Sequence, residues 1–471
     1  MKLLKQIYRR EILSFFTVVF TIAICNAQTT NDKNAPTPPM GWNSYNAFGA
    51  TVRESEIKAN ADFMAVNLKK YGWQYIVVDF CWSYPHHPKS TQSDPPQFRL
   101  KDGSYQPWIS MDEYGRLLPD PNKFPSAING KGFKELADYV HKKGLKFGIH
   151  VMRGIPRQAV WAKLPIKGAN GINASMIADT TSTCSWLNQM YGIDMSKKGA
   201  QEYLNSLLEL YTQWGVDFVK VDDLNDNKGK KYYGNEVEGY RNAIANSKRK
   251  IVFSTSPGFT KMDTIQKSHI ANNADMWRVS GDFWDNWKQL YHAFDLANEW
   301  NSFRQNGHWP DYDMLQLGRI ARRGPVGKER ETAFTPEEQL THMTLWIIGQ
   351  SPLMFGGDLT VIKPATLSLI TNDEALNINQ NAVDARQLSR TDDKVIWVSK
   401  MKDKEIYNVA LFNLTQETKE MSINFSEIGV KGKIAVRDIW KKKELGVFDS
   451  NYSVSVPSHG SVLIQIRTFL D

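Results

Sequence analysis

Short apolar segments that end in a charged or polar residue recur along the first three quarters of this chain of 471 residues. Helical or polar stretches separate them. The segments lie at residues 40–45, 75–80, 146–151, 218–222, 251–256, 276–280, 309–315 and 352–355. Near-continuous apolar runs of this length are typical of parallel strands covered on both faces. Eight such units over roughly 340 residues predict a (β/α)8 TIM barrel.

The best-marked of the intervening helices is expected at residues 336–349. Thr335 precedes it and Glu338 follows three residues later, which is a capping box. A doubly wound sheet is the structural alternative to the barrel. It is disfavoured because no Gly-rich phosphate-binding turn follows the first predicted strand.

The sequence pattern changes near residue 382. From there the apolar residues alternate with a period of two, as in 395–398 and 406–413, and no helical period remains. This alternation predicts a small antiparallel β-sandwich over residues 382–471, after a catalytic barrel over 28–381.

The first 27 residues have the pattern of a secretory signal peptide. Lys2, Lys5, Arg9 and Arg10 precede an apolar run over 12–24, and cleavage is expected after Ala27. A secreted or periplasmic protein is therefore predicted. No other stretch is apolar enough for a membrane span.

Charge and cysteine content narrow the function classes. The net charge is +8, of which the leader carries three, and the remaining lysines form no basic stripe, so a nucleic-acid partner is not expected. No metal-ligand spacing occurs among the histidines and cysteines, and no cofactor is predicted. Cys81 and Cys184 remain after the leader, and whether they pair stays open.

Two aspartates follow predicted strands and are candidates for paired catalytic carboxylates. Asp222 ends the segment 218–222, and Asp282 follows the segment 276–280. Catalytic groups of such barrels lie at the carboxyl ends of the strands. A retaining glycosidase needs a nucleophile and an acid/base about 5–5.5 Å apart, which two such strand ends can provide. The alternative is that both are ordinary loop or capping aspartates.

Other polar residues at strand ends are weaker candidates. Lys220 shares a strand face with Asp222 because strand side chains alternate, and a nearby cation keeps a carboxylate ionised. His150 ends the third predicted strand, where it is either a pocket residue or a satisfied rim histidine. Asp79, Asp313 and Tyr45 follow the same positional logic.

Several short motifs, in this order and spacing, resemble glycoside hydrolase family 27, the melibiase-type α-galactosidases and α-N-acetylgalactosaminidases. They are Pro39–Ser44, Asp79–Trp82, Gly144–Ile149, Lys220–Asp222, Arg278 with Asp282, Asp311–Leu315 and Val456–Ser461. The resemblance covers the barrel and reaches into the sandwich.

The resemblance implies a role for each matching residue. Asp222 would be the nucleophile and Asp282 the general acid/base of an α-galactosidase acting on terminal galacto-configured sugars of oligosaccharides or polysaccharides. The residues that would bind or enclose the sugar are Trp42, Tyr45, Asp79, His150, Lys220, Ser256, Arg278 and Asp313. Trp42 and Tyr45 would form walls of the pocket.

Departures from the family pattern concern the choice of sugar. Phe80 stands where the family usually has a second aspartate, His150 replaces a tyrosine, and Ser256 replaces a glutamate. A small residue at 256 implies α-N-acetylgalactosaminidase activity, whereas loss of the aspartate suits β-L-arabinopyranose, which lacks the CH2OH group. A catalytically silent sugar-binding protein on the same barrel is the alternative outside enzymes.

Overall fold

The computed structural model describes residues 33–84, 97–99, 105–107, 109–225, 231–258 and 261–468. The predicted leader, residues 1–27, lies outside these ranges. Within them, no helix has the length and apolar character that crossing a bilayer requires.

Eight parallel strands form the barrel predicted from the sequence, in the order β12-β11-β10-β9-β5-β2-β1-β15. In chain order they are β1 (Met40–Asn43), β2 (Tyr75–Val78), β5 (Lys146–Met152), β9 (Phe218–Asp222), β10 (Val252–Thr255), β11 (Met276–Arg278), β12 (Trp309–Asp311) and β15 (Leu353–Phe355). A parallel bridge between Leu315 and Phe355 links the segment after β12 to β15. The carboxyl ends of all eight strands therefore lie at one end of the barrel.

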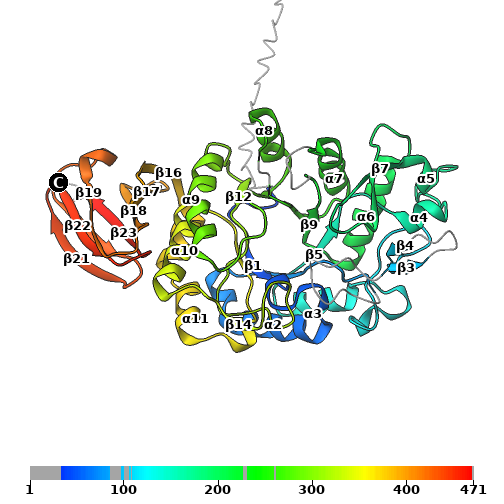
Figure 1. Ribbon diagram of the computed structural model, residues 1–471, viewed down its shortest axis with the longest axis horizontal. Coiled ribbons are helices and arrows are strands. Elements are labelled where there is room, and N and C mark those ends of the chain that lie inside the picture. The colour runs from blue at the N-terminus through cyan, green and yellow to red at the C-terminus, as the bar shows by residue number, and fades with distance from the viewer. Residues whose placement is uncertain are drawn as a thin grey trace, which may run out of the picture. The chain divides into compact units, whose positions relative to one another are not determined.

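Helices surround these strands in Figure 1. The longer ones are α2 (Glu54–Asn67), α3 (Lys134–Lys142), α6 (Ala200–Trp214), α7 (Gly234–Asn246), α8 (Thr264–Asn273), α9 (Trp287–Asn301), α10 (Pro336–Ile348), α11 (Pro364–Ile370) and α12 (Asp373–Asn381). The predicted capping box of α10 is present, because Thr335 accepts from the Glu338 N–H and Glu338 accepts from the Thr335 N–H.

The segment 154–193 holds more structure than its polar sequence indicates. It forms a three-stranded sheet of β6 (Ile155–Pro156), β8 (Met190–Ile193) and β7 (Ala178–Thr183), together with helices α4 (Arg157–Trp161) and α5 (Ala174–Ile177). These strands have two to six residues each, too few to produce a recognisable apolar period.

The C-terminal part is the predicted antiparallel sandwich. Its six-stranded sheet has the order β16-β17-β18-β23-β20-β21, and β19 pairs with β22. The strands are β16 (Ala382–Arg390), β17 (Lys394–Met401), β18 (Ile406–Asn413), β19 (Lys419–Asn424), β20 (Ile434–Asp438), β21 (Lys443–Phe448), β22 (Asn451–Val456) and β23 (Ser461–Thr468). Figure 1 shows them in orange to red.

His459 of the sandwich contacts two helices of the barrel. Its ring stacks on Trp287 of α9, with centroids 3.6 Å apart, and its Nδ1 lies 2.7 Å from Glu338 Oε1 of α10. Thr341 of α10 donates to the His459 carbonyl group. One buried side chain thus connects the sandwich to the helix that follows the Asp282 loop.

We expect His459→Asn to lower the free energy of unfolding by about 2 kcal/mol, because a hydrogen bond to a charged group and an aromatic stack are both lost. Asparagine tolerates the left-handed backbone at this position (φ 54°), so backbone strain does not confuse the result. Urea unfolding measures the change. His292→Asn, at an exposed position of α9, is the control, and equal midpoints for both variants would contradict the prediction.

Candidate active site

An open pocket of about 670 Å³ lies at the carboxyl ends of the barrel strands. Asp222 and Asp282 both line it, so the fold brings the two predicted carboxylates to one site. Among the residues that the structure describes, those lining it are Tyr45, Asp79, Phe80, His150, Trp186, Lys220, Asp222, Pro257, Gly258, Gly281, Asp282, Trp284, Gln289 and Val326.

Asp222 is held by hydrogen bonds to both carboxylate oxygens. Oδ2 lies 3.0 Å from Nε2 of His150, and Oδ1 accepts the N–H of Asp223 at 2.7 Å. The side chain is only 12% exposed. Burial opposes ionisation, but the hydrogen bond and charge of His150, assisted by Lys220, leave the pKa of Asp222 below its usual value. The group therefore stays ionised, as a nucleophile must.

Lys220 was expected beside Asp222, but its direct partner is another carboxylate. Its Nζ lies 3.4 Å from Asp79 Oδ2, so Lys220 pairs directly with Asp79 rather than with Asp222. Asn43 also donates to Asp79 Oδ2, at 2.8 Å. Burial raises the pKa of Asp79, yet Lys220 and these hydrogen bonds lower it to about 2. Asp79 is thus a fixed anionic acceptor on the pocket wall.

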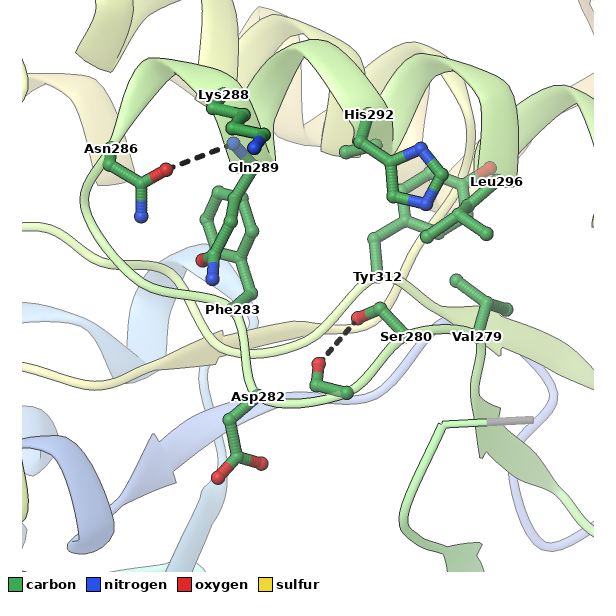
Figure 2. A pocket seen from close by; sticks show the side chains of 12 residues that line it. Val279, Ser280, Asp282, Phe283, Asn286, Lys288, Gln289, His292, Leu296 and Tyr312 are labelled. Atoms are coloured by element: carbon green, nitrogen blue, oxygen red, sulfur yellow. Dashed lines mark hydrogen bonds between the residues drawn. The ribbon is translucent and has the colours of Figure 1, made fainter. Parts of the chain in front are cut away.

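Asp282 lies on the loop between β11 and α9 and is much more exposed, with 53% of its side chain accessible. Its Oδ1 is 3.4 Å from Arg278 Nη2. Figure 2 shows the Asp282 side chain extending away from Lys288 and His292 of α9. An exposed carboxyl group with a loose cationic partner is accessible to a substrate oxygen.

Buried contacts of Asp313 fix the loop that carries Asp282. Arg278 Nη2 pairs with Asp313 Oδ2 at 2.8 Å, and the same carboxylate oxygen accepts the N–H of Phe283 at 2.7 Å. Burial raises the pKa of Asp313 to about 6 despite the guanidinium of Arg278. Arg278 and Asp313 therefore hold the backbone next to Asp282, and neither of them lines the pocket.

The loop after β10 packs closely against the Asp282 loop. A Cβ atom at Gly258 would lie 1.5 Å from the carbonyl oxygen of Ser280, so only glycine allows this approach. Pro257 and Gly258 line the pocket, whereas Ser256 is 2% exposed and does not. Ser256 is therefore not part of the pocket lining, and its contact with the sugar stays a prediction.

Trp42 also differs from the expectation that it forms a pocket wall. It is fully buried in β1, and its indole N–H donates to the carbonyl of Gly357. Gly357 lies in the loop after β15, and Trp42 is not among the residues that line the pocket. Tyr45, two residues beyond β1, does line the pocket.

Aromatic residues that were not predicted as site residues complete the pocket. Phe80 lies between the rings of Tyr45, His150 and Trp186, at centroid distances of 5.6, 5.8 and 6.2 Å. The sequence already linked Phe80 to the choice of sugar, without predicting it as a residue that lines the pocket. The position of Trp284, two residues after Asp282, was a usable signal, whereas Trp186, Gln289 and Val326 lie in segments without any motif.

Two models of known protein families match this chain. The family model described as Alpha galactosidase A matches residues 102–179 and 188–381, and the Alpha galactosidase C-terminal beta sandwich domain matches 391–466. The chain belongs to glycoside hydrolase family 27. The resemblance inferred from the motifs is confirmed, and the chain is a glycoside hydrolase.

The relatives of this glycoside hydrolase are named for different sugars. This chain is 45% identical to a β-L-arabinopyranosidase of the same family from Geobacillus stearothermophilus, and the alignment covers 93% of this chain and 98% of that one, with a TM-score of 0.87. A Bacillus halodurans protein, provisionally assigned as an alpha-N-acetylgalactosaminidase, is 42% identical, with coverage of 93% and 99% and a TM-score of 0.82. Alpha-galactosidase 2 of Arabidopsis thaliana is 26% identical over 437 residues, 91% and 89% of the two chains.

We expect His150→Ala to move the acidic limb of the pH profile of kcat/KM to higher pH. Without the hydrogen bond from His150, burial of Asp222 is less well compensated, so its pKa rises and a higher pH is needed to ionise it. His141→Ala is the matched control, because His141 bonds Asp217 just before β9, at the opposite end of the strand from Asp222. An unshifted limb in His150→Ala would contradict this account of Asp222.

Proposed function

We propose that this chain is a secreted retaining exo-glycosidase that hydrolyses terminal sugars with the galacto configuration by double displacement. Asp222 attacks the anomeric carbon while Asp282 protonates the departing oxygen, which gives a covalent glycosyl-enzyme. Asp282 then removes a proton from water, which displaces Asp222 from the anomeric carbon. The observation that carries the proposal is the presence of both carboxylates in one pocket, one buried and hydrogen-bonded and the other exposed.

The environments of the two carboxylates support this division of labour. Asp222 is fixed at both oxygens and has a lowered pKa, which suits a nucleophile that stays ionised. Asp282 is 53% exposed and its Oδ1 lies 3.4 Å from Arg278, so a substrate oxygen can reach this carboxyl group at the pocket surface. Asp79 and Lys220, paired on the wall, would bind ring hydroxyl groups as acceptor and donor.

Two sugars share the ring that such a site would bind. α-D-Galactopyranose and β-L-arabinopyranose have the same arrangement of ring hydroxyls, and the pentose lacks the hydroxymethyl group. Phe80 favours the pentose as the better substrate, because an apolar ring beside Asp79 gives a hydroxymethyl oxygen no partner. The 45% identity to a β-L-arabinopyranosidase supports the same choice. α-Galactosides remain substrates in this proposal.

For an α-galactoside, the first product seen by NMR is expected to be α-galactose, which mutarotation later converts to an equilibrium mixture of the two anomers. Two displacements at the anomeric carbon restore the original configuration. Asp222→Asn should release no sugar above background. Immediate appearance of the β anomer would exclude the retaining mechanism, and sugar binding without hydrolysis in the wild type would indicate a silent binding protein.

We expect Phe80→Asp to raise the ratio of kcat/KM for p-nitrophenyl α-galactoside over the β-L-arabinopyranoside by about tenfold or more. A carboxylate at this position would accept a hydrogen bond from the hydroxymethyl group, which only galactose has. Phe80→Leu keeps the wall apolar and serves as the control. If both variants keep the wild-type ratio, Phe80 does not select the sugar.

A further inference from the structure

The residue after Asp222 has an unusual backbone. Asp223 lies in the left-handed region with φ 64°. This conformation costs a residue with a side chain on the order of 1 kcal/mol, which contacts with the surroundings must offset. In this conformation the Asp223 N–H donates to Oδ1 of Asp222 at 2.7 Å. The left-handed turn thus fixes one carboxylate oxygen of the proposed nucleophile.

Arg153, just beyond β5, holds both peptide groups of this turn. Its backbone N–H donates to the carbonyl of Asp222 at 2.9 Å, and its side-chain Nε donates to the carbonyl of Asp223 at 2.6 Å. The same Nε lies 3.1 Å from the Asp223 carboxylate. One residue from a neighbouring strand end therefore binds the turn through main chain and side chain together.

The guanidinium of Arg153 is itself immobilised. Nη1 donates to Glu236 at 2.8 Å, Nη2 donates to Ser182 at 2.9 Å, and the group lies 3.4 Å from the ring centroid of Tyr233. The side chain is 2% exposed. A Cβ atom at position 192 would come within 2.8 Å of Nη1, so Gly192 leaves the room that the guanidinium occupies.

Arg153 could act in this cluster through its charge alone or through the fixed geometry of its hydrogen bonds. It is the cation between two buried carboxyl groups, and burial raises the pKa of Asp223 and of Glu236 to about 7. If charge compensation were its whole function, a lysine would serve almost as well. A lysine, however, cannot donate in the fixed planar geometry that reaches Asp223, Glu236 and Ser182 at once.

We propose that Arg153 is a positioning residue for Asp222, holding the left-handed turn at Asp223 so that the carboxylate is aimed at the anomeric carbon. This inference rests on Asp222 being the nucleophile, as proposed above. Arg153 does not line the pocket, so it acts on the reaction through the turn and not on the sugar.

The test compares Arg153→Lys, Asp223→Gly and the double variant, using p-nitrophenyl β-L-arabinopyranoside and α-galactoside. Arg153→Lys is expected to lower kcat about 100-fold with KM within about twofold of wild type, because the nucleophile is displaced while the binding groups are untouched. Glycine adopts the left-handed turn without help, so the double variant should recover at least about tenfold of the lost kcat.

Failure of the inference differs from failure of the proposed function. Arg153→Lys with wild-type kcat, or a double variant as slow as Arg153→Lys, overturns the positioning role while an inert Asp222→Asn leaves the mechanism standing. An active Asp222→Asn overturns both. Should circular dichroism show that Arg153→Lys does not fold, Ser182→Ala loosens the same guanidinium. For that variant kcat should fall several-fold at constant KM, and an unchanged kcat overturns the inference.

Discussion

Buried charges at one end of a parallel barrel must be paired, and this requirement determines how the site is built. The carboxyl ends of β2, β5, β9 and β11 bring Asp79, His150, Lys220, Asp222 and Arg278 together. A buried ion without a partner would cost several kcal/mol. The result is a set of defined contacts: Lys220 with Asp79, His150 with Asp222, and Arg278 with Asp313.

Each contact also decides what its carboxylate can do. Hydrogen bonds to both oxygens keep Asp222 ionised, and the pair with Lys220 keeps Asp79 an acceptor. Asp313 contacts Arg278 and accepts the Phe283 N–H, whereas Asp282, the residue before Phe283, lies exposed at the pocket surface. The same packing that avoids unpaired charge thus distinguishes a buried carboxylate, the proposed nucleophile, from an exposed one, the proposed acid/base.

Much of this could be predicted from the sequence. Apolar runs ending in charge identified the barrel strands, and the spacing of Lys220 and Asp222 correctly placed both on the pocket side. The direct partners could not be predicted, because they depend on which neighbouring strand ends face each other. Sequence likewise could not show that the buried Trp42 indole donates to the carbonyl of Gly357, or that Ser256 is buried while Pro257 and Gly258 line the pocket.

The account depends most on Asp222 forming a bond to the sugar. Incubation with an activated, ring-fluorinated galacto-configured glycoside should slow the second displacement and leave the sugar attached to the protein. Peptide mass spectrometry is then expected to find the label on Asp222 and to lose it when a competing galacto-configured sugar occupies the pocket. A label on a different residue would contradict the account, as would inactivation of Asp222→Asn by the same reagent with the same stoichiometry.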